Sequence, residues 1–138
     1  MSRIVIVDYS CGNIDSVQSA VNYHGQKSII TRDSEIIRNA EKIILPGQGS
    51  FKTGIKNLKK YGLFDLIKTK TLEDKVPILG ICLGMQIFAT YGFEDGKEYG
   101  LNLIPGKVDK LTTTELKLPH IGWNQIKKKK RRFITPKH

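Results

Sequence analysis

Four short runs rich in isoleucine and valine recur along the first 81 residues, and they limit the fold of this chain more than any other feature. They lie at Arg3–Asp8, Lys27–Thr31, Lys42–Leu45 and Pro77–Ile81. Each run is apolar with little alternation, which is typical of a strand buried on both faces. Amphipathic stretches with helical spacing separate the runs. The alternation predicts an α/β fold in which helices cover a parallel sheet.

The helical stretches carry apolar residues three or four positions apart. The three stripes are Ile14, Val17 and Val21; Phe51, Ile55 and Leu58; and Leu63, Leu66 and Ile67. Asp33 or Ser34 is placed to cap a short helix before the third run. After Gly100 the pattern changes to shorter strands, which are predicted at Leu101–Ile104, Lys107–Leu111 and Gly122–Ile126, with a turn at Pro105-Gly106.

Length and composition are those of one globular domain. The chain has 138 residues, of which 39% are hydrophobic and 26% charged. No stretch approaches the roughly 20 apolar residues that span a bilayer, and the first apolar run is too short for a signal peptide. Cys11 and Cys82 are therefore expected to be free thiols. We expect a cytoplasmic protein without a membrane segment.

The net charge of +10 is concentrated at the end of the sequence. Seven lysines and arginines and no acids lie between Gln125 and His138. We therefore expect a domain over residues 1–126, followed by a basic tail at 127–138 that is disordered or not native to the fold. Such a tail can bind phosphate backbones without sequence preference, but a solvated end is the favoured interpretation, and no specific nucleic acid is expected.

The sharpest local motif is Gly80-Ile81-Cys82-Leu83-Gly84, which follows an apolar run and precedes a helical pattern. It is the cysteine counterpart of a nucleophile elbow, in which a sharp strand-to-helix turn exposes the central residue. Glycines are needed on either side because a Cβ there would collide with a neighbouring helix or strand. The helix amides beside the sulfur favour the thiolate and can hold an oxyanion. The alternative is a small buried core cysteine.

A second loop is expected beside the first. Pro46-Gly47-Gln48-Gly49-Ser50 follows the third strand run and leads into a helix. In a doubly wound sheet, ligands bind outside the carboxyl ends of the strands. The loop can therefore bring backbone amides to a ligand oxygen, although a simple Pro-Gly turn is the alternative.

Together these motifs resemble a known family. Gly80–Gln86 and Pro46–Gly49, with Pro119–Asn124 downstream, are similar to the glutaminase subunit of imidazole glycerol phosphate synthase, a class I glutamine amidotransferase. Val7-Asp8-Tyr9 with Gly12-Asn13 resembles its opening, and Leu103–Val108 its middle section. The resemblance implies a three-layer, flavodoxin-like parallel or mixed sheet that lacks its C-terminal strands here. It implies neither a cofactor nor a metal ion.

The resemblance also implies roles for individual residues. Cys82 would attack the side-chain amide of L-glutamine, releasing ammonia and leaving a thioester that water hydrolyses. Amides of Leu83, Gly47 and Gly49 would hold the oxyanion. Gln86 and Glu94 would bind the α-amino and carboxylate end of glutamine, with Asp95 a rival to Glu94 because Gly92–Gly96 is one residue longer than usual.

The implied partner is a (β/α)₈-barrel cyclase of histidine biosynthesis, to which the ammonia passes. The segment that would lie near the interface is His120, Ile121, Gly122, Trp123 and Asn124, with Trp123 as a contact anchor or, alternatively, a core aromatic. A homologous pair that aminates a sugar in surface polysaccharide synthesis is equally compatible with the sequence.

The acid–base pair of the family, a His-Pro-Glu segment, is not found in the sequence. His24 is predicted to lie on the surface, His120 belongs to the interface motif, and His138 is terminal. A fragment, an interrupted gene, or completion by another chain would each explain this, and a frameshift within the Lys127–Lys130 run is the favoured hypothesis. Without this pair the chain would be inactive, and a non-catalytic remnant that still docks its partner is the rival function.

Overall fold

The computed structural model describes residues 3–112, 118–125 and 127, and these form two sheets flanked by helices. The strands are β1 (Ile4–Val7), β2 (Ser28–Thr31), β3 (Lys42–Leu45), β4 (Ile78–Gly80), β5 (Ala89–Gly92), β6 (Glu98–Tyr99) and β7 (Ile104–Val108). The helices are α1 (Ile14–Tyr23), α2 (Ser34–Arg38), α3 (Phe51–Lys60), α4 (Phe64–Leu72) and α5 (Leu83–Gln86).

The main sheet is entirely parallel and has the order β2-β1-β3-β4. This is the strand order of flavodoxin-like sheets, so the predicted α/β fold is confirmed. The order reverses between β1 and β3, which is the place where ligands bind in such sheets. All four predicted strand runs form strands within their predicted bounds.

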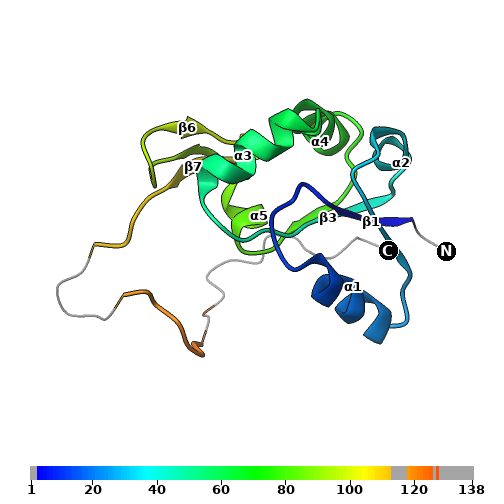
Figure 1. Cartoon of the computed structure of the whole chain (residues 1–138), viewed down its shortest axis with the longest axis horizontal. Helices are drawn as coiled ribbons and strands as arrows, with labels where there is room; N and C mark the ends of the chain where they lie inside the picture. Colours follow the sequence, from blue (N-terminus) through cyan, green and yellow to red (C-terminus); the bar gives the residue numbers. More distant parts are fainter. Residues whose placement is uncertain (1–2, 113–117, 126, 128–138) are drawn as a thin grey trace.

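Helices cover both faces of the main sheet and make a three-layer structure (Figure 1). On one face, Val17 and Val21 of α1 pack on a small cluster that includes Ile6 of β1. On the other face, α2, α3 and α4 bury a larger core that includes Leu45 and Ile55. The three predicted helical stripes therefore face the sheet as expected, and Asp33 caps α2 by accepting hydrogen bonds from two backbone amides.

Burial on both faces holds only for the inner strands. All residues of β1 and the last three residues of β3 are buried. The outer strands β2 and β4 contain no fully buried residue, and Leu79 of β4 is 56% exposed. The prediction that all four runs are buried on both faces is therefore wrong for β2 and β4, because within the described residues each pairs with one neighbour only.

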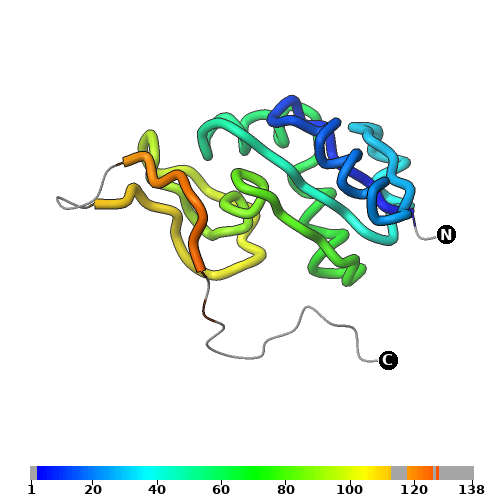
Figure 2. The backbone as a smooth tube through the Cα atoms, turned by 90° about the horizontal axis from the view of Figure 1, so that it is seen from below, coloured from blue at the N-terminus to red at the C-terminus, as the bar shows by residue number. Residues whose placement is uncertain are grey.

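A second sheet of order β6-β5-β7 lies at one end of the main sheet (Figure 2). Strand β7 runs through Pro105-Gly106, so the predicted turn there is wrong. The pairing of β5 with β7 shifts register between Ala89 and Tyr91 of β5. An irregularity of this kind lets β7 contain Pro105 and Gly106, which a regular strand disfavours. The predicted strand Leu101–Ile104 is also wrong, because only Ile104 joins a strand.

Residues 118–125 lie apart from the helices and sheets and are drawn in orange in Figure 1. The described part of the predicted strand Gly122–Ile126 is not a strand. Lys127 is the one described residue of the predicted basic tail; residues 128–138 lie outside the described residues. Within the described part of the chain, the helices are too short or too polar to cross a membrane.

Candidate functional site

Cys82 occupies the sharp turn between β4 and α5. Its backbone has φ 54° and ψ −115°, a conformation that residues with a side chain rarely adopt. The residue is exposed, and α5 begins directly after it at Leu83. The elbow predicted from the motif is therefore formed, and the alternative of a buried core cysteine is wrong.

The two glycines around Cys82 are required by close backbone contacts. A Cβ atom at Gly80 would lie 2.6 Å from the Cα atom of Met85 in α5. A Cβ atom at Gly84 would lie 1.7 Å from the carbonyl oxygen of Leu45, the last residue of β3. One contact involves the next helix and the other the neighbouring strand, as the motif predicts. The elbow can therefore form only where both positions lack a side chain.

The Pro46–Gly49 loop lies directly beside the elbow because β3 and β4 are adjacent and parallel. The Leu83 amide donates a hydrogen bond to the Gly47 carbonyl oxygen, with an N···O distance of 3.3 Å. Gly49 has φ +107°, which favours glycine, and Gln48 is exposed. The loop is thus more than a connecting turn. Its Gly47 carbonyl oxygen accepts a hydrogen bond from the Leu83 amide, which was predicted to hold an oxyanion.

The two predicted glutamine-binding residues occupy different settings. Gln86 lies one helical turn after Cys82 and borders a hollow of about 190 Å³ between α5 and β7. The Glu94 carboxylate accepts a hydrogen bond from the Phe51 amide in the first turn of α3, at 2.8 Å. Asp95, the rival to Glu94, is exposed. Glu94 is therefore tied to the helix that follows the Pro46–Gly49 loop.

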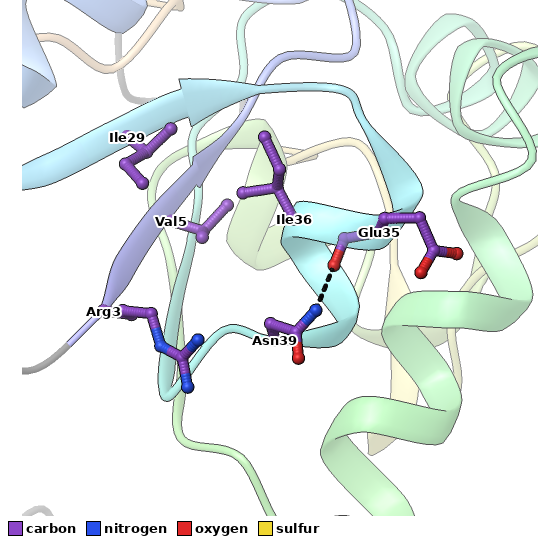
Figure 3. A pocket seen from close by; sticks show the side chains of 6 residues that line it. All are labelled: Arg3, Val5, Ile29, Glu35, Ile36 and Asn39. Carbon is purple, nitrogen blue, oxygen red and sulfur yellow. Dashed lines mark hydrogen bonds between the residues drawn. The ribbon is translucent and has the colours of Figure 1, made fainter.

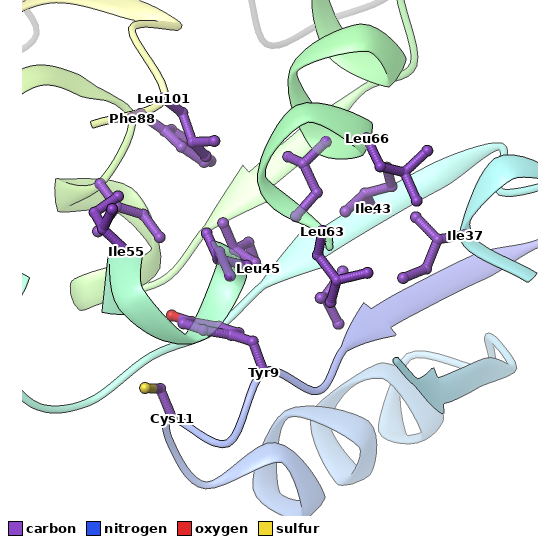
Figure 4. Packing of buried hydrophobic residues seen from close by; sticks show 14 of the residues in the cluster. Tyr9, Cys11, Ile37, Ile43, Leu45, Ile55, Leu63, Leu66, Phe88 and Leu101 are labelled. Carbon is purple, nitrogen blue, oxygen red and sulfur yellow. The ribbon is translucent and has the colours of Figure 1, made fainter. Parts of the chain in front are cut away.

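Tyr9 and Cys11 form the buried side of the site. Both follow β1, and Figure 4 shows the Tyr9 hydroxyl on the same side as the Cys11 sulfur. The Asn57 side-chain amide donates to the Cys11 sulfur at 3.3 Å. Burial raises the pKa of the Cys11 thiol, and the Asn57 hydrogen bond offsets only part of this. Sequence reasoning gave Tyr9 no role, although an aromatic hydroxyl directly after the first strand of a parallel sheet was a usable signal.

The carboxyl end of β1 also carries a charged cluster. Arg32 pairs with Asp8 and lies over the Tyr61 ring, 4.6 Å from its centroid. The Tyr61 hydroxyl is 3.0 Å from the Ser10 hydroxyl. Burial raises the pKa of Asp8, but the hydrogen bonds from Arg32 and the Ser10 amide, with the Arg32 charge, hold it below its ordinary value. This cluster fixes the segment that leads to Tyr9 and Cys11.

The predicted interface segment is exposed. Trp123 has a relative exposure of 104% and Ile121 of 87%, so the alternative of a core aromatic is wrong for Trp123. The Asn124 side-chain nitrogen is 2.7 Å from His120 Nε2. An exposed tryptophan beside an exposed isoleucine is a suitable contact surface, and the interface assignment stays a prediction.

Neither described histidine is bonded to Cys82. His24 follows α1, which runs antiparallel to β1, and is therefore near the amino ends of the strands. His120 contacts Asn124 in the exposed segment. The described residues also contain no group of three or more His, Cys, Asp or Glu side chains arranged to hold a metal ion. What they assemble is an exposed cysteine at a sharp turn, with backbone amides beside it.

Figure 3 shows a separate hollow, which has a volume of about 280 Å³. It is lined by Arg3, Val5, Ile29, Glu35, Ile36 and Asn39. These residues lie toward the amino ends of the parallel strands, whereas Cys82 lies at the carboxyl end of β4. The hollow therefore does not belong to the site around the elbow.

Comparison of the sequence with known proteins gives consistent matches. The family model for class-I glutamine amidotransferases matches residues 5–136. The imidazole glycerol phosphate synthase subunit HisH of Lactococcus lactis is 48% identical over 126 residues, which cover 91% of this chain and 61% of that protein. HisH 2 of Methanococcus maripaludis is 44% identical, with 90% and 61% covered. HisH of Geobacter sulfurreducens is 40% identical, with 95% and 65% covered.

Comparison of the fold gives a crystal structure of a glutamine amidotransferase, with a TM-score of 0.64 and 23% sequence identity. The match covers 76% of this chain and 55% of that one. At this identity the likeness concerns the fold alone. The chain spans about three fifths of the length of its HisH relatives.

Proposed function

Because this chain belongs to the class I glutamine amidotransferase family, we propose that it binds L-glutamine and that Cys82 attacks the side-chain amide of this substrate. The observation that carries the proposal is the elbow itself, with φ 54° at an exposed cysteine directly before a helix. A strained backbone of this kind persists where it serves a site. The free thiols also suit a reducing cytoplasm, where we place the protein.

In the proposed reaction the Cys82 thiolate adds to the amide carbon of glutamine. The oxyanion that forms would be held by the Leu83 amide and an amide of the Gly47–Gly49 loop. Collapse of this intermediate breaks the carbon–nitrogen bond, releases ammonia after protonation of the nitrogen, and leaves a thioester. Water then hydrolyses the thioester to glutamate and restores the thiol.

Two side chains would orient the substrate. Gln86 lies one turn along α5 from Cys82, at the rim of the neighbouring hollow. Glu94 offers a carboxylate near the Pro46–Gly49 loop through its bond to Phe51. A carboxylate pairs with the α-ammonium group of glutamine, and an amide can bind its α-carboxylate.

The proton transfers require a base that the sequence does not supply in recognisable form. None of the three histidines precedes a Pro-Glu pair. We propose that the base and its orienting carboxylate correspond to the part of the relatives that this chain does not span. Whether supplied by the same protein or by another chain, they would have to reach Cys82 from outside the described site.

The proposed acceptor of ammonia is a (β/α)₈-barrel cyclase of histidine biosynthesis. Support comes from the HisH relatives, whose name assigns them to imidazole glycerol phosphate synthase. The exposed segment His120–Asn124, with Trp123 at its centre, is the proposed contact surface. Its aromatic and aliphatic side chains suit the centre of a protein interface.

An electrophilic glutamine analogue tests the proposal. A chloroketone analogue should label Cys82 with a rate that saturates with concentration, and excess glutamine should protect the thiol. Labelling at Cys11, or labelling of Cys82 without saturation and protection, would reject glutamine binding. Mass spectrometry of the digested protein identifies the modified cysteine.

A second function is favoured by the exposed Trp123. The chain would then dock a barrel partner without hydrolysing glutamine. Ammonia release at an appreciable rate, with or without a cyclase, rejects this candidate. Binding to the cyclase with no ammonia release supports it.

A further inference from the structure

One face of the small sheet carries three large aromatic side chains that are partly open to solvent. Tyr91 of β5 lies opposite Tyr99 of β6 in the antiparallel register, and Phe93 follows β5. The ring centroids of Tyr91 and Tyr99 are 5.2 Å apart, and those of Tyr91 and Phe93 are 6.3 Å apart. Tyr99 is 59% exposed and Phe93 is 37% exposed. The three rings therefore form one continuous surface, which we call the aromatic row.

The core does not account for the aromatic row, because glycines occupy the opposite face of the same segments. A Cβ atom at Gly92 would lie 2.4 Å from the Phe51 ring, and a Cβ atom at Gly100 would lie 3.0 Å from it. Gly92 and Gly100 therefore face the core. The residues of the aromatic row alternate with these glycines and point outward. A half-exposed sheet usually turns its polar side chains to solvent, so outward aromatic rings indicate a binding surface.

Two lysines lie beside the aromatic row. The Lys97 ammonium group is 4.3 Å from the Tyr91 ring centroid and 5.3 Å from that of Tyr99. Lys107 of β7 pairs with Tyr91 in the parallel register, and its ammonium group is 5.7 Å from the Phe93 ring centroid. A cation at such a distance is attracted to the ring face. Each ring of the aromatic row therefore has an ammonium group beside it.

These ammonium groups are available to an anionic ligand. Lys97 forms no ion pair within the part of the chain that the structure describes. Lys107 pairs with Asp109 at 2.9 Å, but the two side chains are 63% and 50% exposed. Water screens an ion pair that is this exposed, so the pair holds Lys107 only weakly. Both lysines can therefore turn to an anion that reaches the sheet.

We propose that the aromatic row, with Lys97 and Lys107, binds single-stranded nucleic acid without sequence preference. Bases would stack on the rings, and the phosphates between them would contact the two ammonium groups. In RNA-recognition domains, aromatic side chains on the face of a small sheet stack a few bases in this way. Every base has a face that can stack, so no sequence preference is expected. The inference is independent of the proposed reaction at Cys82, because none of these residues has a role in it.

Two other anionic partners fit this face less well. An acidic peptide would pair with the lysines but would make no use of three adjacent rings. A flat anionic membrane would meet the Asp109 carboxylate together with Lys107, since the two groups are 2.9 Å apart. A nucleic acid strand carries a stacking ring and a point charge in every unit, and lysine suits a phosphate as a point charge. The interleaved rings and cations therefore favour the strand.

Fluorescence anisotropy with a labelled oligothymidylate strand tests the proposal. Tyr99→Leu should weaken binding about tenfold, the effect of losing one stacked base. Tyr23→Leu changes an aromatic of 87% exposure on α1, and this matched control should bind as tightly as the unaltered protein. A strand of equal length without bases should have the same, weaker affinity for the unaltered protein and for Tyr99→Leu. Full-strength binding by Tyr99→Leu, or no binding by the unaltered protein at low salt, overturns the proposal.

Lysine variants separate the sheet face from the basic residues near the end of the sequence. Lys97→Gln and Lys107→Gln should each reduce the salt dependence of binding by about 0.7 in log–log slope, which corresponds to one phosphate contact. Lys42→Gln, at an exposed position where β3 begins, should leave the slope unchanged. Equal reductions in all three variants would show that net charge alone drives binding, and would overturn the proposal.

Vesicles and an acidic peptide provide the last test. Binding to phosphatidylserine vesicles or to polyglutamate should not depend on Tyr99. If Tyr99→Leu weakens either of these as strongly as it weakens binding of the strand, the face does not recognise bases and the proposal fails. The thermal midpoint of Tyr99→Leu shows whether this variant folds normally. If the midpoint falls, the lysine variants still decide, because their side chains lie on the surface.

Discussion

The Glu94 carboxylate and the Phe51 amide are joined by a hydrogen bond of 2.8 Å, which links the segment after β5 to the first turn of α3. Ser50 caps the same helix by accepting a hydrogen bond from the Thr53 amide. Two acceptors therefore satisfy the start of the helix that follows the Pro46–Gly49 loop. A negative charge at this end is also favoured by the helix dipole. The loop is held in place by the segment that carries a predicted substrate ligand.

Replacement of Glu94 should thus reduce both stability and substrate affinity. Glu94→Gln should lower the free energy of unfolding by about 1 kcal/mol, because the helix loses a charged acceptor. It should also raise the concentration of glutamine analogue that half-saturates labelling of Cys82. Asp95→Asn is the matched control. If Asp95→Asn weakens labelling and Glu94→Gln does not, the two assignments are reversed.

Cys82 should react with iodoacetamide roughly tenfold or more faster than Cys11. Cys82 is exposed, whereas Cys11 is 6% exposed and burial raises the pKa of its thiol. Mass spectrometry of a time course gives both rates in one sample. Similar rates at the two cysteines would show that the fold does not protect Cys11, and would contradict the packing described here.

Gly84→Ala should disrupt the elbow. Its new methyl group would lie 1.7 Å from the Leu45 carbonyl oxygen, and the backbone cannot move away without breaking the contact between β3 and α5. We expect a loss of roughly 1–3 kcal/mol in the free energy of unfolding, measured in urea, and loss of saturable labelling at Cys82. Gly54→Ala is the control, because its methyl group would meet side-chain atoms rather than backbone, namely those of Leu83 at 3.2 Å and of Ile87 at 3.6 Å. Equal costs for both variants would refute the steric argument.

The Asp8–Arg32 pair should make stability depend on pH in the acid range. The pKa of Asp8 in the folded protein is below its ordinary value, as explained above. Its stabilising contribution is therefore complete above the unfolded pKa of about 3.9 and is lost as the pH falls through the lower folded pKa. Asp8→Asn should lower the thermal midpoint at neutral pH. It should also make the decrease of the thermal midpoint with falling pH smaller below about pH 4. Arg32→Met should produce the same flattening, and an unaltered profile in both would contradict the pairing.

Trp123→Ala should leave stability unchanged and weaken partner binding. The side chain is fully exposed, so the free energy of unfolding should change by less than about 0.5 kcal/mol. If Trp123 is a contact anchor, removing its side chain should weaken binding to the cyclase by about 2 kcal/mol, measured by calorimetry. Tyr23→Ala, an exposed aromatic on α1, is the control and should bind normally. Normal binding by Trp123→Ala would remove this residue from the interface.

The main sheet and its helices were predictable because local pattern and burial agree there. The apolar runs at β1 and β3 become inner strands, and the stripes of α1, α3 and α4 face them. Of the small sheet, only Lys107 and Val108 of the predicted strand Lys107–Leu111 lie in a strand, β7, and strands β5 and β6 were not predicted, because long-range hydrogen bonds decide this sheet. The helix predicted after the Gly80–Gly84 motif ends at Gln86, because the Ile87 and Phe88 carbonyl groups accept hydrogen bonds from the amides of residues 101, 103 and 104. The local sequence around Ile87 and Phe88 does not indicate these distant hydrogen-bond donors.

At the site, the Gly80–Gly84 motif correctly predicted the sharp turn at Cys82, because this turn depends only on the spacing of residues in the sequence. Gly80, Cys82 and Gly84 occupy the elbow as expected, because a strained turn restricts which residues fit. The state of the Leu83 amide was not predictable, since it depends on how the Gly47 carbonyl group is oriented. The Tyr9 hydroxyl, which is buried without a hydrogen-bond partner among the described residues, was equally hidden, because its environment is built from three separate segments.

Strand β4 has an edge that no described residue pairs with, and this edge leads directly to Cys82. Beside it, Leu79 and Ile81 border an apolar groove of about 360 Å³ against α1. A strand joining this edge would place one of its ends next to the sulfur. Such a strand would cover the exposed apolar side chains of Leu79 and Ile81, and it would bring the proposed base to Cys82 if it carries that base. In such an arrangement, pairing of the β4 edge and assembly of the proposed catalytic site would be coupled.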